Sequence, residues 1–298
     1  MLKVEQLKKT FGDYTAVDNL SFEIPNGKIL GLIGQNGAGK TTTFRLILDF
    51  LQADKGKITW DGQKVDKNIY NTIGYMPEER GLYPKETVEN QLLYFAELKG
   101  INRKEASQRI DKWMTEFQVK GKRNDKLKKL SKGNQQKVQL IATLLHEPKL
   151  VILDEPFSGL DPVNAGLLKD AIIKLKDQGA SVIFSSHNMD NVEKISDHLV
   201  MLKSGKLVLN GEIHQIRESY GRTHLLLEAD ITKQQLLEVD GVLSVEEKGH
   251  QTFEIRLREA EVGKEIFKLV NTDGYIPIFN QQPPTLEEIF KMEVGGVQ

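Results

Sequence analysis

Three unbroken apolar runs, at residues 29–33, 150–153 and 181–184, stand out from a chain that otherwise mixes hydrophobic and polar positions. Runs without alternation are typical of parallel strands that are buried on both faces of a sheet. Between the second and third runs, a helical pattern opens at Asp161–Pro162 and is closed by Gly179. The pattern therefore predicts a β-α-β unit within a parallel sheet.

The pattern changes character twice along the chain. Residues 1–80 alternate like half-buried strands, and we expect an antiparallel flap beside the strand at 29–33. From about 86 to 147 the spacing is helical, which predicts an inserted helical subdomain. Past about residue 213 the order β-α-β-β-α-β begins, with its last strand at 275–279, which suits a small ferredoxin-like domain. We predict an α/β fold with a mixed sheet in residues 1–215 and a small α+β C-terminal domain in residues 216–298.

A glycine-rich loop, Gly34-Gln35-Asn36-Gly37-Ala38-Gly39-Lys40-Thr41, joins the first apolar run to an amphipathic helix. It fits the P-loop pattern G-x-x-x-x-G-K-[ST] in the context that this pattern requires. Its glycines let backbone N–H groups converge on one anion, beside the positive end of a helix. Lys40 would reach the β- and γ-phosphates of a nucleotide, and Thr41 would offer a hydroxyl to Mg²⁺. A glycine-rich turn that only caps a helix is the alternative, and it requires neither side chain.

Polar residues follow the two later apolar runs, at the edge of the sheet where the glycine-rich loop also lies. Asp154 can hold Mg²⁺ directly or through water, and Glu155 can act as base on a water aimed at the γ-phosphorus. His187 can hydrogen-bond the γ-phosphate and so report its presence. The alternatives are two carboxylates in a solvated turn and a structural histidine.

Composition narrows the class of protein. With 298 residues, 39% hydrophobic and 28% charged, the chain is a globular protein of one or two domains. A net charge of -1 gives no overall attraction to nucleic acid or to an anionic membrane. The absence of cysteine excludes disulfides and cysteine-ligated zinc. No apolar run approaches the roughly 20 residues of a membrane span, so work at a membrane requires a partner that supplies the spans.

Over residues 1–215 the chain resembles the ATP-binding cassette (ABC) family. The resemblance rests on the P-loop, the segment Ser131-Lys132-Gly133-Asn134-Gln135, the pair 154–155, the segment Ser158-Gly159-Leu160-Asp161 and His187, in that order. It implies an ATPase with ATP and Mg²⁺ as ligands. It places nucleotide binding at Phe11, Gly34, Asn36, Gly37, Gly39, Lys40, Thr41 and Thr42. It places catalysis at Glu155, His187 and Glu78, and metal binding at Thr41, Asp154 and Glu78.

The resemblance also implies partners. Two ATPase subunits, identical or different, would meet head to tail, so that each ATP lies between one P-loop and the other subunit's signature residues Ser131, Gly133 and Asn134. Ser158 and Asp161 would form the adjoining D-loop. Phe11 stands where the family places an aromatic ring that stacks on adenine. Ordinary packing at a strand end is the alternative for Phe11, and Tyr14 is the competing candidate for the stack.

Two departures from the family pattern carry further information. Lys132 and Asn134 replace a glycine and a glutamine of the usual signature, and Glu78 replaces a glutamine that precedes the helical subdomain. Together with the C-terminal extension that ends in residues 285–290, they resemble the ATPase subunits of sodium-efflux and drug-efflux exporters. The resemblance implies a separate integral membrane permease and a cytoplasmic location on the inner face of the cell membrane. It does not name the exported substrate.

Two other functions are weighed against the exporter. A soluble ABC ATPase that acts on DNA would carry long coiled coils between P-loop and signature, and one that acts on ribosomes would carry two cassettes. The chain shows neither, and its basic run at 120–132 lacks the interleaved aromatic residues of a nucleic-acid surface. A non-hydrolysing, ATP-gated binding module is the other alternative, and the intact Glu155 and His187 argue against it.

Overall fold

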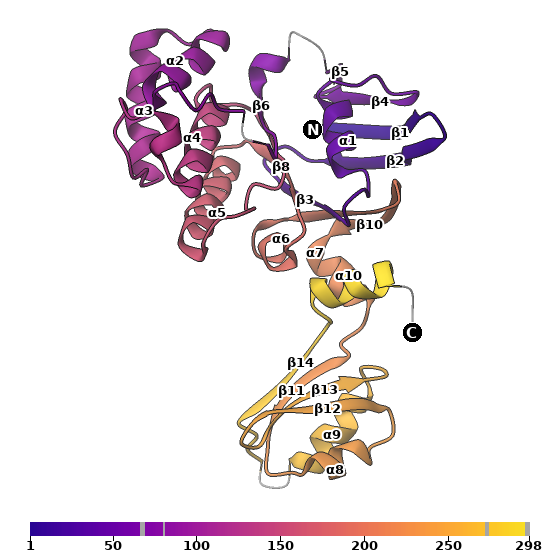
Figure 1. Ribbon diagram of the computed structural model, residues 1–298. Helices are drawn as coiled ribbons and strands as arrows, with labels where there is room; N and C mark the ends of the chain where they lie inside the picture. Colours follow the sequence, from indigo (N-terminus) through magenta and orange to yellow (C-terminus); the bar gives the residue numbers. More distant parts are fainter. Residues whose placement is uncertain (66–68, 80, 272–273, 296–298) are drawn as a thin grey trace. The chain divides into compact units, whose positions relative to one another are not determined.

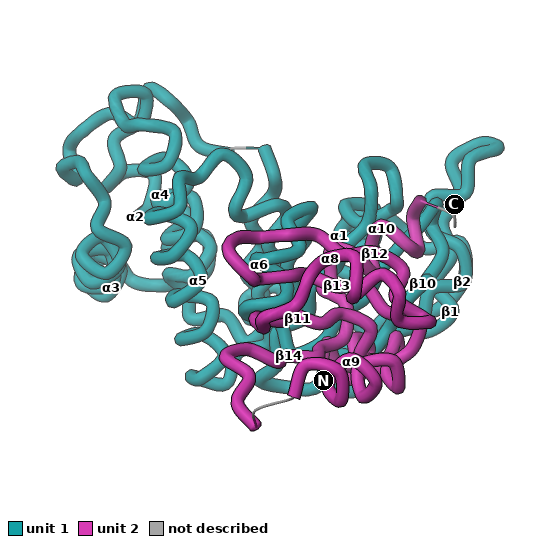
Figure 2. The backbone as a smooth tube through the Cα atoms, turned by 90° about the horizontal axis from the view of Figure 1, so that it is seen from below, with its two compact units in different colours: residues 1–211 teal, residues 212–298 magenta. Residues whose placement is uncertain are grey.

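The computed structural model describes residues 1–65, 69–79, 81–271 and 274–295. The chain divides into two compact units, Met1–Gly211 and Glu212–Gln298, which Figure 2 shows in different colours. The first unit contains two sheets and most of the helices, and the second contains one sheet with its own helices.

A six-stranded sheet forms the centre of the first unit, in the order β10-β9-β3-β8-β7-β6. The three predicted apolar runs form β3 (Ile29–Gly34), β7 (Leu150–Leu153) and β8 (Ser181–Ser186), and every residue of these strands is buried. They pair in parallel, and β9 and β6 run parallel to their neighbours β3 and β7. This confirms the predicted buried parallel sheet. The other strands are β6 (Ile73–Met76), β9 (His198–Lys203) and β10 (Lys206–Glu212).

An antiparallel sheet of order β2-β1-β4-β5 confirms the predicted flap. Its strands are β1 (Leu2–Phe11), β2 (Tyr14–Ile24), β4 (Lys55–Trp60) and β5 (Gln63–Lys64). Inward residues of this sheet, such as Leu7 and Leu20, share one core with Leu30 and Ile183 of the parallel sheet and with Phe44 of α1 (Lys40–Ile47). The shared core fixes the flap against the glycine-rich loop.

The helical part lies to one side of the parallel sheet, as Figure 1 shows, and consists of α2 (Val88–Leu98), α3 (Arg103–Glu116) and α4 (Lys132–Leu144). Each of these helices begins after a residue whose side chain accepts the backbone N–H three positions on, which are Thr87, Asn102 and Ser131. Of two short 3₁₀ turns, Tyr70–Thr72 directly precedes β6, and Leu127–Lys129 lies between α3 and α4. The structure thus confirms an inserted helical subdomain.

Two further helices belong to the first unit, α5 (Pro162–Asp177) and α6 (Met189–Ile195). The first was expected from its apolar spacing. The second was not, because its seven residues are too few to show a helical period. Its only sequence signal is Asn188, whose side chain accepts the N–H of Asn191 and caps the helix.

The second unit has an antiparallel sheet of order β12-β13-β11-β14, the ferredoxin-like order that the sequence predicted. Its elements are α7 (Ile213–Ser219), β11 (His224–Glu228), α8 (Lys233–Leu237), β12 (Val242–Gly249), β13 (Thr252–Leu257), α9 (Val262–Val270), β14 (Ile278–Gln282) and α10 (Leu286–Gly295). The last strand was expected at 275–279. It begins later because Pro277 has no N–H to donate, and its polar end, Asn280 to Gln282, pairs with β11.

Candidate functional site

The glycine-rich loop leads from the end of β3 into α1, and its tip, residues 35–37, is exposed. Gly39 precedes α1 with a φ of 103°, and a Cβ on it would lie 2.4 Å from the carbonyl oxygen of Ala16. Glycine alone tolerates both the left-handed backbone and this close approach. The first turn of α1 has no acidic residue to compete for its free N–H groups. The loop therefore has the geometry and the electrostatics of an anion site.

Lys40 is the first residue of α1 and is buried, with 7% of its surface exposed. Its Nζ donates to the carbonyl oxygen of Gly34 at 2.8 Å and to that of Gln35 at 3.4 Å. The same atom lies 3.9 Å from Oε1 of Glu155. The ammonium thus lies between the loop and a carboxylate, in position to pair with an anion that enters the loop.

Asp154 directly follows β7, and both of its carboxylate oxygens are held. Oδ2 accepts a hydrogen bond from the Thr41 hydroxyl at 2.9 Å, and Oδ1 accepts one from the Ser185 hydroxyl at 2.7 Å. Burial, with a smaller contribution from the negative charge of Asp154, raises the pKa of Tyr75 to about 12. The hydrogen bond between the Thr41 hydroxyl and Asp154 thus makes two of the three predicted metal ligands neighbours.

The donor set at Thr41 and Asp154 fits Mg²⁺. Both groups offer hard oxygen atoms, which Mg²⁺ prefers. Within the part of the chain that the structure describes, no group of three or more His, Cys, Asp or Glu could hold a metal ion. Mg²⁺ is usually bound by one or two protein groups, with substrate phosphates and waters supplying the rest. These two residues suit an ion that arrives with a nucleotide.

Glu155 has an unusual backbone and two side-chain neighbours. Its φ is 48°, in the left-handed region that residues with a Cβ rarely adopt. Its N–H donates to Ser185 Oγ at 2.7 Å, and its Oε2 lies 2.9 Å from His187 Nδ1. The His187 side chain is 70% exposed, so the ring contacts the carboxylate while the rest of it is open to a ligand. The structure thus brings Lys40 and Thr41 together with the residues that follow β7 and β8.

Two aromatic rings lie at the tip of the β1–β2 hairpin, where Phe11 pairs with Tyr14. Both are exposed, at 46% and 55%. The Tyr14 hydroxyl donates to the carbonyl oxygen of Gly37 in the glycine-rich loop at 2.9 Å. Lys9 Nζ lies 5.5 Å from the centre of the Phe11 ring. The Tyr14 hydroxyl is therefore hydrogen-bonded to the loop, whereas the Phe11 ring is partly exposed with the Lys9 ammonium over one face.

The signature segment begins α4. Ser131 is the N-cap of this helix, and the Asn134 side-chain amide donates to Ser131 Oγ at 2.9 Å. The amide oxygen of Asn134 accepts the N–H of Lys120 at 2.8 Å. No hydrogen bond or ion pair joins residues 131–134 to the glycine-rich loop, and the structure describes both segments in full. A single chain therefore does not bring its own signature onto its own P-loop.

The predicted D-loop lies next to the signature. Ser158 is exposed, and Asp161 is the N-cap of α5, where its carboxylate accepts the Asn164 N–H at 3.0 Å. That hydrogen bond holds the pKa of Asp161 below its usual range. A Cβ on Gly133 would lie 3.3 Å from Asn164 Nδ2. The absence of a side chain at Gly133 thus lets the start of α4 lie close to the start of α5.

No polar contact with a described residue fixes the side chains of four predicted residues, which are Glu78, Asn36, Thr42 and the D-loop residue Ser158. Glu78 follows β6, is exposed, and makes no hydrogen bond or ion pair with any described residue. Asn36 lies at the exposed loop tip, and Thr42 is half-buried in α1.

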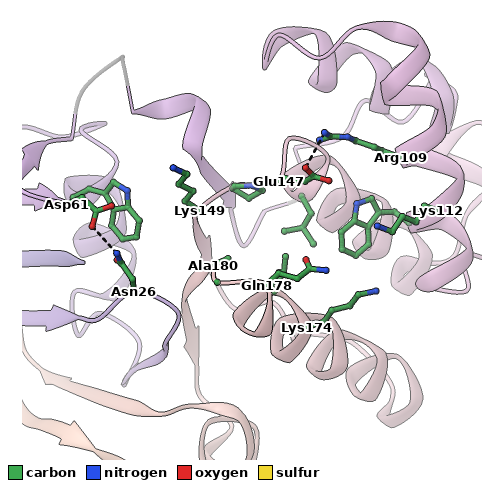
Figure 3. Close-up of a pocket in the computed structure, with 15 residues that line it drawn as sticks. Asn26, Asp61, Arg109, Lys112, Glu147, Lys149, Lys174, Gln178 and Ala180 are labelled. Carbon is green, nitrogen blue, oxygen red and sulfur yellow. Dashed lines mark hydrogen bonds and ion pairs between the residues drawn. The ribbon is translucent and has the colours of Figure 1, made fainter.

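A cavity of about 550 Å³ lies elsewhere in the first unit, as Figure 3 shows. Lys149 and Ala180, which line it, directly precede β7 and β8, and Asn26 precedes β3. Arg109 forms an ion pair with Glu147 at its edge, at 3.2 Å. The cavity thus lies at the amino ends of the parallel strands. It is separate from the glycine-rich loop and the two carboxylates at their carboxyl ends.

Ser185 is the residue at the site to which the sequence assigned no role. It stands in the polar ending of β8, and its hydroxyl contacts both Asp154 and the Glu155 backbone. No sequence signal identifies this contact, because it depends on strand register: β7 and β8 are parallel, with Leu153 opposite Phe184, so the next residue on each strand faces the other.

In the parallel sheet, a phosphate-binding type of loop follows β3, and two carboxylates follow β7, which is separated from β3 by β8. This arrangement defines a P-loop nucleotide-binding protein. The family model described as ABC transporter matches residues 17–158. The model described as the C-terminal domain of ATP-binding protein DrrA1-3-like matches residues 211–294. The chain belongs to the ATP-binding proteins of ABC transporters, and it is an ATPase of that type.

Known relatives span the chain to different extents. The uncharacterized ABC transporter ATP-binding protein YhaQ of Bacillus subtilis is 45% identical over 297 residues, which cover 100% of this chain and 99% of that protein. The linearmycin resistance ATP-binding protein LnrL of the same organism is 32% identical, over 71% of this chain and 69% of LnrL. A solved structure of an ATP binding subunit of an ABC transporter superposes with a TM-score of 0.69 at 30% identity, and the match covers 74% of this chain and 93% of that one.

Proposed function

We propose that this chain is the ATP-hydrolysing subunit of a membrane exporter and that ATP closes two such subunits into a dimer. The observation that carries the proposal is the cluster at the carboxyl edge of the parallel sheet. There Lys40 and Thr41 of the loop meet Asp154, Glu155 and His187 through direct contacts. Binding, metal-holding and proton-accepting groups are thus assembled around one phosphate position.

Each residue has a defined part in the proposal. Lys40 exchanges its carbonyl partners for the β- and γ-phosphates, because an ammonium pairs more strongly with an anion than with a neutral acceptor. Thr41 and Asp154 would hold Mg²⁺, which would neutralise charge on the phosphates. Glu155 accepts a proton from the attacking water, and His187 moves from Glu155 to the γ-phosphate. Glu78 accepts a hydrogen bond from a water at the metal or at the γ-phosphorus.

The dimer follows from what a single chain leaves incomplete. The signature residues Ser131, Gly133 and Asn134 are not bound to the chain's own P-loop, and ATP-binding subunits of this family work in pairs with membrane permeases. We place the signature of one subunit, identical or different, on the γ-phosphate of the other. Loss of that phosphate would then release the dimer, in the manner of an order–disorder switch.

The helical subdomain is connected to the catalytic edge. The Gln136 side chain donates to the carbonyl oxygen of Pro156 at 2.6 Å, and the Gln139 side chain donates to that of Pro77 at 3.1 Å. Both glutamines lie on α4, which begins with the signature. Movement of α4 during dimer closure would therefore reach the turn after Glu155 and the loop that holds Glu78.

Export, and with it the permease, is the finer part of the proposal. It is supported by the match of the C-terminal region to the DrrA1-3-like domain and by the name of LnrL, a resistance protein. No described helix is long and apolar enough to cross a membrane. We place the chain in the cytoplasm, on the inner face of the cell membrane. We also propose residues 1–215 and 216–298 as its domains, which the two compact units support.

An apolar groove of about 410 Å³ supports the permease as a partner. It lies beside the segment that follows Glu78 and is lined by Leu48, Phe50, Tyr70, Ile73, Tyr75, Pro77, Gly81, Leu82, Phe95, Leu98, Lys99, Gln139, Ala142, Thr143 and His146. Phe50 and Leu98 are 60% and 61% exposed, and exposed apolar surface of this kind marks interaction sites.

The replacement Leu98→Glu is expected to uncouple the chain from its permease and to leave its own ATPase rate unchanged. Burial of an unpaired charge at the centre of an interface should weaken permease binding by roughly 30-fold or more, equal to about 2 kcal/mol. The measurement is co-purification with the multi-span membrane protein that we expect the neighbouring reading frame to encode. Leu243→Glu is the matched control, because Leu243 is 60% exposed but lies in the second unit. Equal binding by both variants would contradict the groove.

The replacement Phe11→Ala is expected to weaken ATP binding without changing the affinity for tripolyphosphate. Stacking of an aromatic ring on a base contributes about 1–3 kcal/mol, which corresponds to roughly 5- to 150-fold in Kd. Tripolyphosphate lacks the base and reports the P-loop alone. Tyr14→Ala is the comparison, and a larger loss of ATP affinity in Tyr14→Ala than in Phe11→Ala, with an unchanged affinity for tripolyphosphate, would transfer the stack to Tyr14.

A further inference from the structure

The buried hydroxyl of Ser185 links the two functional carboxylate residues that follow β7. Ser185 is 0% exposed on β8. Its Oγ donates to Asp154 Oδ1 at 2.7 Å and accepts the backbone N–H of Glu155 at 2.7 Å. A serine hydroxyl has one proton to donate, and here that proton goes to Asp154. The Ser185 hydroxyl thus holds the Asp154 side chain and the Glu155 backbone in fixed positions relative to each other.

The backbone of Glu155 needs such a restraint. A residue with a Cβ at a φ of 48° is strained, and strain of this kind persists only where the surroundings fix the conformation. Glu155 lies just past the end of β7, and its N–H donates to the oxygen of the Ser185 hydroxyl. The carbonyl oxygen of Glu155 accepts from Ser158 N at 3.1 Å, which closes the turn from the other side. The conformation directs the Glu155 carboxylate to Lys40 and His187.

Asp154 depends on the same hydroxyl. Its Oδ2 faces Thr41, and its Oδ1 is bonded to Ser185. With Oδ1 held, the carboxylate plane cannot turn, so Oδ2 stays beside the Thr41 hydroxyl. The partners of a metal-binding carboxylate orient it in this way, and their loss typically lowers metal affinity or activity by about 10- to 100-fold.

We infer that Ser185 is a positioning residue of the ATPase site, which sets the Glu155 carboxylate for proton transfer and the Asp154 carboxylate for Mg²⁺. The inference rests on the roles proposed above for Glu155 and Asp154. Ser185 is 0% exposed, so we expect it to contact neither ATP nor the attacking water. Its effect is therefore expected in turnover and in the response to Mg²⁺, and not in the binding of the nucleotide without metal.

The test compares Ser185→Ala with Ser181→Ala. Ser181 lies on the same strand, is also 0% exposed, and likewise accepts one backbone N–H, that of Gly27 at 3.1 Å, and donates to one carbonyl, that of Pro25 at 3.4 Å. Ser185→Ala should lower kcat by about 10- to 100-fold. Ser181→Ala should keep kcat, with a comparable loss in melting temperature. Ser185→Thr keeps the hydroxyl and should recover most of the rate. An equal loss of kcat in the two alanine variants, or a normal kcat in Ser185→Ala, overturns the inference.

A second readout does not depend on turnover. In a Glu155→Gln background, ATP is added first with EDTA and then with Mg²⁺, and the melting temperature is measured each time. Ser185→Ala should leave the increment from ATP alone unchanged and reduce the additional increment from Mg²⁺. An undiminished rise in melting temperature with Mg²⁺ would show that Ser185 does not position Asp154 for the metal. If Glu155→Gln alone still hydrolyses ATP normally, the proposed catalytic role of Glu155 fails, and this result is separate from either outcome at Ser185.

Discussion

Glu155→Gln is expected to bind ATP as the unaltered chain does, to lose hydrolysis and to accumulate as a closed dimer. An amide of the same size cannot accept the proton of the attacking water, and general-base catalysis contributes roughly 10²- to 10⁴-fold to a rate. Lys40 lies 3.9 Å from the carboxylate and remains free to bind phosphate. His187 Nδ1 keeps an amide neighbour in place of the carboxylate, so the local fold should persist. Because the γ-phosphate is not removed, the subunits that it joins should not separate.

Three measurements separate the parts of this expectation. Nucleotide titration reports binding, phosphate release reports turnover, and size-exclusion chromatography with ATP reports the dimer. Glu147→Gln is a suitable control, because it removes a carboxylate from the cavity at the opposite edge of the same sheet, where Glu147 is exposed and pairs with Arg109. A normal rate of phosphate release by Glu155→Gln would show that another group accepts the proton. Loss of ATP binding would mean that Glu155 contributes to the affinity for ATP and not to catalysis.

Much of the site could be predicted from the sequence because the direction of the parallel strands determines which residues lie close together. Parallel strands bring their carboxyl ends to one edge, so the residues after 29–33, 150–153 and 181–184 had to lie near one another. Gly39 was required by the pattern, and the structure shows its reason in the nearby carbonyl of Ala16. Predictions of this kind need only the order of elements and the period of apolar residues.

Side-chain partnerships across strands could not be obtained in this way. Ser185 contacts Asp154 only because β7 and β8 pair in one register, and register is invisible in a continuous apolar run. The Tyr14 hydroxyl bond to Gly37 likewise depends on how the flap lies against the loop. The positive φ of Glu155 has no sequence signal, since glutamate rarely adopts it. The sequence therefore located the groups, and the structure supplied the contacts that orient them.

In the second unit, too, the sequence predicts the order of the elements but not the hydrogen bonds that define their ends. The order β-α-β-β-α-β indicated a ferredoxin-like domain, and the sheet order confirms it. The hydrophobic pattern predicts the start of the last strand three residues too early, because apolar residues lie on both sides of Pro277, whereas residues 278–282 form the pairing. At the edge of a sheet, backbone hydrogen bonds with the neighbour define the strand, and its outward side chains are free to be polar.

Lys40→Ala is expected to abolish measurable ATP binding. Its ammonium lies at the loop, 7% exposed, and forms charge-assisted hydrogen bonds to the carbonyls of Gly34 and Gln35. Phosphate would receive the same donor with full charge pairing, so its removal should cost about 3 kcal/mol or more, at least roughly 100-fold in Kd. Lys99→Ala is the matched control, because Lys99 Nζ also donates to two backbone carbonyls, at 2.6 and 3.1 Å, but outside the P-loop.

The two lysine variants together distinguish loss of a ligand contact from loss of structure. Each leaves two carbonyl oxygens without an ammonium, so each should lower the melting temperature of the free chain. Only Lys40→Ala should also lose the rise in melting temperature that ATP produces in the unaltered chain. Unchanged ATP affinity in Lys40→Ala would contradict phosphate binding at residues 34–41. A loss of affinity in both variants would mean that the carbonyl contacts of Lys40 maintain the loop and that the ammonium is not itself the phosphate ligand.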